Sequence, residues 1–438
     1  MNTVSLLEIR DCLDGSVPAT IATCSEDGTP NVAQLSQGFY VDAKHVALSF
    51  QFFNRTRKNI LENPRAVIKV SHPSTGAHFV LTLLFVRTES EGPLFEAMRA
   101  QLAGIAAHSG MAGVFELKGS DIYRVLHVRK LPGRTMQVPV LQRLSSLREL
   151  LAHVCQVTDL ASVVDRTVEG LAAYLGFKHV AFFLRDTSGD ILTLLASHGY
   201  EASGIGAEIR FGQGVIGCAA KHGVPIRINH VTREQAYVHA VKASLSQQAE
   251  PTLIPFPGLE QPGSQMAVPV MADDGCTGVL FVEDQAAESF DYQHEEALRS
   301  LAEALVWGLK AGMAITPTGP KRAIDPPAVT CAAIRIYLSD HSVFIDDEYL
   351  IKGVAGAIFL KLVRSYLESG RCQTTNRALR LDPAIGLPDW SANLETRLLL
   401  LQRRLQEKCG FIRLGRPARG RIQLLVERQI TLTCVAET

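Results

Sequence analysis

The segment Phe53-Asn54-Arg55-Thr56-Arg57-Lys58-Asn59-Ile60-Leu61-Glu62-Asn63-Pro64 decides how the first part of this chain is interpreted. An apolar run at 46–50 precedes it, and the closing Asn-Pro pair predicts the end of a short helix. That helix begins beside three cations and a threonine hydroxyl. Free backbone N–H groups at a helix start favour an anion, and arginine offers paired donors to phosphate oxygens. The segment therefore predicts a phosphate site, with a solvated basic turn as the alternative.

The composition indicates a soluble globular protein of about three domains. Of the 438 residues, 47% are hydrophobic and 20% charged, and the formal net charge is zero. The charge is unevenly distributed, because residues 1–320 hold 26 basic and 32 acidic side chains and residues 321–438 hold 18 and 12. We therefore expect any polyanionic partner to bind the C-terminal third.

The nine cysteines are scattered, and no two of them form a CxxC pair. This pattern favours reduced thiols and argues against a zinc site or a disulfide framework. The N-terminus lacks a signal-peptide pattern, and no apolar run approaches the length of a bilayer span. We expect a cytoplasmic protein that binds no metal and no membrane.

Residues 1–135 read mainly as short β-strands. A turn at 26–30 separates two runs in a hairpin pattern, and a helical stretch at 93–107 interrupts the later strands. The expected strands lie at 19–23, 31–37, 39–41, 46–50, 66–70, 79–88, 114–117 and 121–125. Short strands with few helices predict a small closed barrel.

Three stretches of this region, VPATIATCSEDGTPNVAQLS, HVALSFQFFNRTRKNILENPRAVIKV and GVFELKGSDIYRVLHVRKL, stand in a recognisable order. They resemble the FMN-binding split barrel of the pyridoxamine 5'-phosphate oxidase family. The resemblance implies a cofactor site made by a second strand at the flavin ring, a later strand along the ribityl chain and the basic turn at the phosphate. The implied residues, in that order, are Gln34, Leu35 and Ser36, then Ser49 and Gln51, then Thr56, Arg57 and Lys58.

The sequence departs from the biosynthetic oxidase at two places. The second strand, 31–36, lacks the basic ends of the family pattern, and the substrate-binding Arg-x-His appears only in reversed order at His127-Val128-Arg129. We therefore do not expect the vitamin B6 oxidase reaction. An empty dimerisation barrel and a different cofactor are the alternatives to FMN. The histidines of this region, His45, His72, His78 and His108, have no partner at a telling spacing, so no catalytic residue is predicted.

Residues 140–315 contain the motifs FGQGVIGCAA, SQMAVPV, GVLFVED and FDYQHEEALRSLAEAL, in that order. They resemble a GAF domain along the whole region. The glycine spacing of the first motif is attributed to close packing, because no acidic partner follows it as a dinucleotide site requires. The resemblance implies a sensory module that encloses a small molecule between its sheet and the segment 229–263.

Two features of the GAF-like region allow more than one interpretation. Cys218 at a helix start is either a redox switch with a depressed pKa or a small buried side chain. The stripe of leucines on the closing helix is either a dimer interface or part of the domain's own core. The stripe consists of Leu298, Leu301, Leu305 and Leu309.

Beyond a breaker-rich linker at 316–327, residues 325–438 predict two strands, three helices and a final hairpin. This order resembles the winged helix of response-regulator DNA-binding domains, whose third helix enters the major groove. From residue 391 onward the chain has nine basic and four acidic residues. The implied DNA-binding residues are Asn393, Thr396, Arg397, Arg403 and Arg404 on the third helix and Arg416, Arg419 and Arg421 on the wing.

The alternative for the third helix is structural. Leu394, Leu398, Leu401 and Leu405 form one apolar face, and the arginines are then its solvated side. A winged helix that only docks another protein is a further option.

The sequence as a whole predicts a multidomain α+β protein: a split β-barrel, a GAF α/β/α sandwich and a winged helix. The leading hypothesis is a homodimeric transcriptional regulator that couples flavin redox state or a small ligand to DNA binding. The competing hypotheses are an FMN-dependent oxidoreductase with regulatory domains and a scaffold that binds only proteins.

Overall fold

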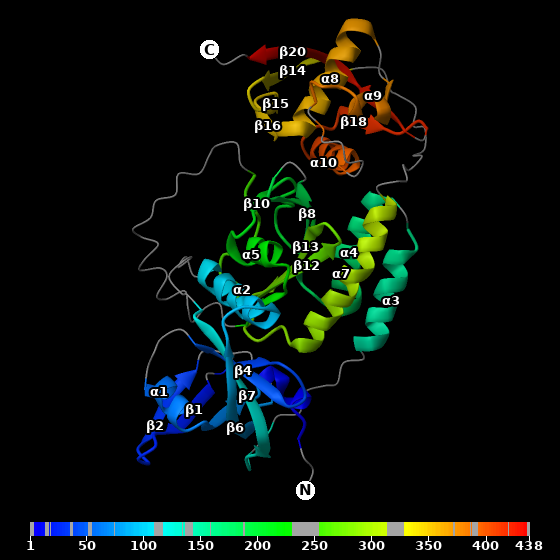
Figure 1. Cartoon of the computed structure of the whole chain (residues 1–438). Coiled ribbons are helices and arrows are strands. Elements are labelled where there is room, and N and C mark those ends of the chain that lie inside the picture. Colours follow the sequence, from blue (N-terminus) through cyan, green and yellow to red (C-terminus); the bar gives the residue numbers. More distant parts are fainter. Residues whose placement is uncertain are drawn as a thin grey trace.

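A computed structural model describes most of the chain, in three successive parts (Figure 1). The described residues are 4–13, 17, 19–35, 38–50, 55–73, 75–108, 117–133, 135, 143–157, 159–186, 189–229, 254–312, 328–370, 373–385, 387, 393–418 and 420–435.

The first part is a seven-stranded antiparallel sheet with the order β2-β1-β5-β6-β7-β4-β3. Its strands are β1 Ala19–Cys24, β2 Pro30–Leu35, β3 Gly38–Tyr40, β4 His45–Phe50, β5 Arg65–Ser71, β6 His78–Glu89 and β7 Gly119–Lys130. Alternating burial along β1 and β5 directs one face of these strands inward, against the 3-10 helix η1 Leu7–Leu13. The predicted hairpin is confirmed, since β1 pairs with β2 in register from Ala19↔Leu35 to Cys24↔Pro30.

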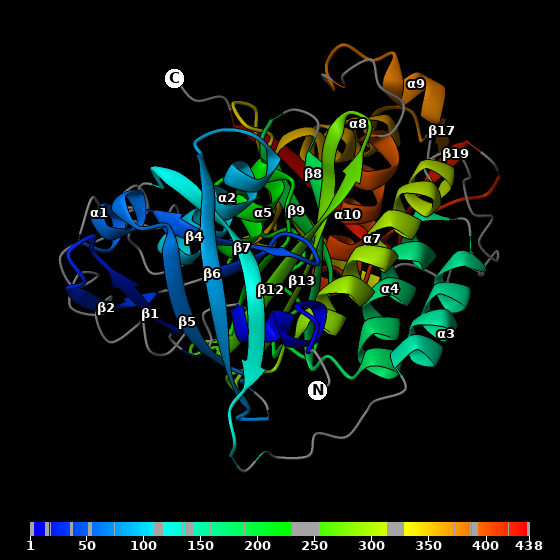
Figure 2. The ribbon, with the colours of Figure 1, turned by 60° about the horizontal axis from the view of Figure 1, so that its bottom comes forward.

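The pairing does not close this sheet. Among the described strands, β2 and β3 remain at opposite edges, so the predicted closed barrel is an open, half-barrel sheet. Two helices complete the part: α1 Arg55–Glu62 packs on β1 and β2, and α2 Pro93–His108 connects β6 to β7. Helix α2 packs on its own sheet through Phe95 and Met98 and also on α5 and β11 of the second part of the chain (Figure 2).

The second part is a six-stranded sheet with the order β10-β9-β8-β13-β12-β11 between two helical layers. Its strands are β8 His179–Asp186, β9 Ile191–His198, β10 Glu208–Arg210, β11 Ile226–Ile228, β12 Ser264–Ala272 and β13 Gly275–Asp284. One face is covered by α3 Arg143–Cys155, α4 Leu160–Leu175 and α7 Tyr292–Gly312, and the other by α5 Gly214–His222 and α2. Both faces are apolar, because continuous runs of β8, β9 and β13 are buried.

The leucine stripe of α7 belongs to this core. Leu298, Leu301, Leu305 and Leu309 are all buried against the sheet and α4. They are therefore not an exposed dimer interface, and the alternative of burial within the domain is the one the structure supports.

The third part combines two small sheets with three helices. The sheets have the orders β16-β15-β14-β20 and β17-β19-β18. The strands are β14 Ala328–Tyr337, β15 Val343–Ile345, β16 Glu348–Ile351, β17 Gln373–Thr375, β18 Ile412–Gly415, β19 Arg421–Val426 and β20 Arg428–Val435, and the helices are α8 Gly353–Ser369, α9 Asn376–Arg380 and α10 Asn393–Lys408. All three helices were predicted, and α9 is capped by Thr375, whose side chain accepts from the amide of Ala378.

Helix α10 lies between the third part and the second (Figure 1). Buried apolar side chains of α4 and α7 join those of α8 and α10 in one continuous cluster. Among the described helices, none is long and apolar enough to cross a membrane.

Candidate functional sites

The residues at the basic start of α1, 55–58, make more contacts within the protein than a solvent-exposed phosphate site would. The Arg57 guanidinium forms an ion pair with Asp121 of β7 and donates to Thr88 Oγ1 at 2.7 Å. Thr88 Oγ1 in turn donates to Asp121 at 2.7 Å. Asp121 is 5% exposed, so a buried carboxylate occupies the position where the sequence predicts a ligand phosphate beside Arg57. The prediction from sequence missed this aspartate, because a single acidic residue in an apolar strand is the only sign of it in the sequence.

The two neighbours of Arg57 differ in their accessibility. Thr56 Oγ1 accepts a hydrogen bond from Asn31 Nδ2 at 2.9 Å, which ties the start of α1 to β2. Lys58 is largely exposed, and its ammonium lies 3.8 Å from Glu62 one turn later. Exposed pairs at this spacing contribute only a few tenths of a kcal/mol (~0.3–0.5), so Lys58 can readily exchange its partner for an anion.

The strand residues predicted to face a cofactor separate into exposed and internal positions. Gln34 is exposed on the edge strand β2, whereas Leu35 packs partly against the core of the sheet. Ser49 on β4 lies opposite Ser120 on β7, whose buried hydroxyl makes no hydrogen bond. Ser36 and Gln51 fall outside the described residues.

The α5 side of the second sheet contains a cluster of aromatic rings around a buried carboxylate. Phe256 lies among Phe183, Tyr200 and Phe281, with ring centroids 5.6–5.8 Å apart. Beside them, Glu283 of β13 is 1% exposed. Its carboxylate accepts from the Leu259 amide and from Gln265 Nε2, both at 2.9 Å. The sequence pointed to Phe256 as part of the segment 229–263, of which residues 230–253 lie outside the described chain.

The charge of Glu283 is poorly solvated. Burial raises the pKa of this carboxyl, and the hydrogen bonds from Gln265 and Leu259 oppose the shift. The Tyr200 hydroxyl is buried beside Glu283, and burial together with the charge and hydrogen bonding of Glu283 raises the pKa of its phenol. A buried acid and a buried phenol hydroxyl amid aromatic rings form an environment suited to a small, partly polar molecule.

Cys218 does not have the environment of a reactive thiol. It is 3% exposed, and its Sγ donates to the Gly212 carbonyl at 3.4 Å. Burial raises the pKa of the thiol, opposite to the depressed pKa that a redox switch requires. The structure thus favours the second interpretation of Cys218, a small buried side chain.

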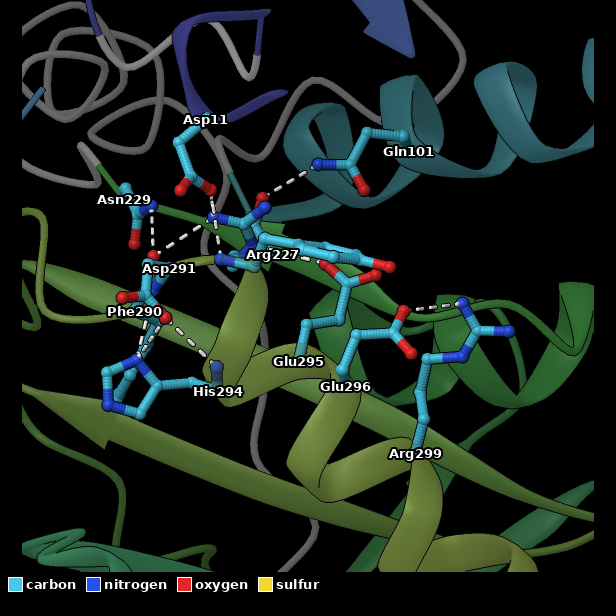
Figure 3. A network of polar contacts seen from close by, with 11 residues as sticks. Asp11, Gln101, Arg227, Asn229, Phe290, Asp291, His294, Glu295, Glu296 and Arg299 are labelled. Atoms are coloured by element: carbon cyan, nitrogen blue, oxygen red, sulfur yellow. Dashed lines mark hydrogen bonds and ion pairs between the residues drawn. The ribbon is translucent and has the colours of Figure 1, made fainter. Parts of the chain in front are cut away.

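A polar network joins the first part of the chain to the second (Figure 3). Arg227 of β11 donates to Glu295 at 3.1 Å and to the Phe290 carbonyl at 3.0 Å, and lies 3.9 Å from Asp11 of η1. Gln101 of α2 donates to the Arg227 carbonyl at 2.7 Å. Four elements, η1, α2, β11 and α7, therefore meet at Arg227, a residue with a buried side chain that the sequence did not single out.

Two of the predicted DNA-binding residues of α10, Arg397 and Arg403, contact the second part of the chain. Arg397 forms an ion pair with Asp186 at the end of β8. Arg403 pairs with Asp165 of α4 at 2.5 Å and donates to the Leu195 carbonyl of β9. Thr396 is buried, and Asn393 begins the helix.

Arg404 and the wing residues are engaged within the third part. Arg404 donates to the Leu350 carbonyl at 2.9 Å and to Glu407 at 2.7 Å. Arg416 pairs with Glu395 at 2.7 Å, whereas Arg421 is exposed at the start of β19. Arg419 lies outside the described residues. DNA binding by these residues stays a prediction, and in this arrangement it requires several of them to exchange partners.

Two family models match separate segments of the chain. The model for pyridoxamine 5'-phosphate oxidase matches residues 7–124, and the model for the GAF domain matches residues 157–306. The chain therefore contains a segment of each type, the first corresponding to the open sheet and the second to the six-stranded sandwich. Neither model reaches the third part of the chain.

Individual relatives are similar over limited regions. A 54-residue stretch is 43% identical to an uncharacterized protein of Methanocaldococcus jannaschii; it is 12% of this chain and spans 36% of that protein's length. The GAF domain of an Acinetobacter phosphoenolpyruvate-protein phosphotransferase is 19% identical with a TM-score of 0.33, covering 41% of this chain and 100% of that one. A free methionine-R-sulfoxide reductase from Neisseria meningitidis is 24% identical with a TM-score of 0.32, and the match covers 40% of this chain and 95% of that one. An FMN-binding protein from Syntrophomonas wolfei is 16% identical with a TM-score of 0.25, covering 29% and 87%.

Proposed function

We propose that this protein is a sensory regulator in which a GAF domain and an FMN-type half-barrel control DNA binding by the third part of the chain. The order of elements in residues 328–435 carries the proposal. A sheet is followed by three helices and a β-hairpin, and the last helix, α10, has a buried leucine stripe and carries Arg397 and Arg403 on a side that meets the second part of the chain. That order supports a winged helix with α10 as its recognition helix.

The charge distribution supports the same proposal. The basic excess of the chain lies in its C-terminal third, where lysine and arginine can neutralise phosphates. The GAF domain would supply the sensed signal, and the aromatic cluster around Glu283 is the place where its described residues suit a small ligand.

FMN fits the half-barrel in part. Lys58 and the N-terminal amides of α1 suit a phosphate, and the unpartnered Ser120 hydroxyl opposite Ser49 suits a ribityl chain. Arg57 does not suit the phosphate directly, because Asp121 already neutralises it. We therefore assign Thr56 and Lys58 to the phosphate and give Arg57 the role of fixing the α1 start. A bound FMN would supply electron-transfer chemistry.

DNA retention at low salt tests the regulatory function. The full chain should bind a pool of random-sequence duplexes with an affinity that falls steeply as salt rises. Arg421→Ala, which alters an exposed wing residue, should weaken binding and reduce the salt slope by about 1. Failure to bind DNA at any salt concentration would contradict the proposal.

A second candidate function rests on the matched oxidase-type segment. As an FMN-dependent oxidoreductase, the purified chain would be yellow and would turn over NAD(P)H through its flavin. A visible spectrum before and after heat release tests for the flavin, and Lys58→Ala should weaken its retention by about 1–3 kcal/mol. A colourless protein that does not take up added FMN would remove this candidate.

A further inference from the structure

Helix α10 is covered on more sides than its own domain can account for. Eight consecutive residues, 394–401, are buried, and so are Arg404 and Leu405. A helix on the surface of a domain buries one stripe and leaves the opposite side in water. The stripe of Leu394, Leu398, Leu401 and Leu405 faces the third part of the chain, so a second body must cover the opposite face.

That second body is the GAF domain. Positions 397, 400, 403 and 407 recur at helical spacing, and each lies against a residue of the GAF domain. Glu407 accepts from the Ser203 hydroxyl at 2.7 Å, and a Cβ on Gly206 would lie 3.7 Å from Leu400. The contact therefore extends over about three turns of α10.

The contact is electrostatically complementary. The GAF domain contributes Asp165, Asp186 and Glu208, and these lie opposite Arg403, Arg397 and Lys352. Burial lowers the pKa of Arg403, and the charge of Asp165 opposes this shift. The acidic residues thus take the place that DNA phosphates would occupy on the same arginines.

We propose that the GAF domain is an internal competitor for α10, so that the helix binds DNA only after this contact opens. The inference rests on the proposed DNA-binding function and adds its regulation. Because the two partners use one face of the helix, their binding is mutually exclusive, and DNA affinity follows the fraction of molecules in which the face is open.

The turn 203–208 connects this contact to the aromatic cluster. A Cβ on Gly204 would lie 2.3 Å from Cδ of Pro257, and one on Gly206 would lie 2.8 Å from Cδ1 of Ile254. The same Cβ on Gly206 would also lie 3.6 Å from Cδ of Arg404 and 3.7 Å from Cδ1 of Leu400. The turn is held between α10 and the short segment that inserts Phe256 among the rings. A ligand that displaces Phe256 therefore disturbs the surface that covers α10.

Removing the acidic partners tests the competition without altering α10. We expect the Asp165→Asn/Asp186→Asn double variant of the full chain to bind a random-sequence duplex pool about tenfold more tightly at fixed salt. Amides of α10 should also exchange faster with deuterium in this variant. Glu296→Gln, which removes one negative charge from an exposed pair on α7, is the matched control and should change neither measurement. If the double variant does not fold, Asp165→Asn alone opens the half-exposed pair and should change both measurements in the same direction.

The outcomes separate the inference from the function on which it rests. Faster exchange in α10 with no DNA binding by any variant would refute the DNA-binding function and leave the covering contact supported. Unchanged exchange and unchanged affinity in the double variant would overturn the inference. Phe256→Ala should likewise speed exchange in the turn 203–208 and in α10, and unchanged exchange in α10 would refute the connection through the turn.

Discussion

The buried guanidinium of Arg227 offers the most quantitative test of how the half-barrel and the GAF domain are joined. Its side chain is 8% exposed, and that of Glu295 is 15% exposed. Arg227→Ala leaves the Glu295 carboxylate without this donor in a poorly solvated place, whereas the Phe290 carbonyl keeps its hydrogen bond from Asn229 Nδ2 at 2.6 Å. Breaking a buried pair from one side costs about 3–5 kcal/mol.

The expected cost converts into a measurable change in melting temperature. For a unit of this size, 1 kcal/mol corresponds to about 2–4 °C, so Arg227→Ala should lower the transition that includes the GAF domain by about 10 °C. Differential scanning calorimetry of the full chain measures this. The exposed pair of Arg299 and Glu296 gives the matched control, and Arg299→Ala should cost less than about 1 kcal/mol.

A double variant separates the stability lost by leaving one charge unpaired from the stability that the ion pair itself contributes. Arg227→Leu/Glu295→Leu removes both charges, so most of the stability lost in the single variant should return. A melting temperature for Arg227→Ala no lower than that of Arg299→Ala would refute the reasoning, since the network in Figure 3 would then contribute nothing beyond a surface pair.

Three further predictions concern the GAF domain. The native pKa of Glu283 lies above its usual value of 4.5, so the folded protein keeps this proton to a higher pH than the unfolded chain does. The free energy of unfolding should therefore fall as pH rises from 4.5 to the native pKa. In urea unfolding at a series of pH values, Glu283→Gln should flatten this slope. Gly217→Ala would place a Cβ 2.2 Å from the Arg210 carbonyl oxygen and should cost about 1–3 kcal/mol, whereas Gly189→Ala, with no atom nearby, should cost less than about 0.5 kcal/mol in the same assay. Cys218, buried with a raised pKa, should react with iodoacetamide far more slowly than the exposed Cys155; mass spectrometry of the labelled peptides measures both, and equal rates would contradict the buried environment.

Local patterns in the sequence were sufficient to predict most of the helices and strands. The turn at 26–30 predicted the pairing of β1 with β2, because a hairpin signal acts within a few residues. Leucine spacing predicted which side of α10 packs inward, and Leu394, Leu398, Leu401 and Leu405 are at most 1% exposed. The order of motifs predicted both segments that the family models match.

Local sequence patterns could not predict contacts between residues that lie far apart in the chain. Arg57 was correctly placed at the start of α1, but its counter-ion Asp121 is 64 residues later, on a strand brought alongside by β-pairing. The closed barrel was a wrong prediction for a similar reason. Seven of the eight expected strands correspond to β1–β7, and residues 114–116 of the remaining one, expected at 114–117, lie outside the described residues. Closure depends on whether the two edge strands meet, which short runs of sequence do not specify.

The sequence by itself determined the parts of this protein: an oxidase-type sheet, a GAF sandwich, and a C-terminal part with a helix that has one apolar face and one arginine-bearing face. Only the tertiary structure decided where those arginines point. A charged helix face has no preferred partner in isolation, because water, phosphate and carboxylate all satisfy a guanidinium. Packing of α10 against the GAF domain brings Asp165 and Asp186 to Arg403 and Arg397 across more than two hundred residues, and this proximity in space selects the carboxylates.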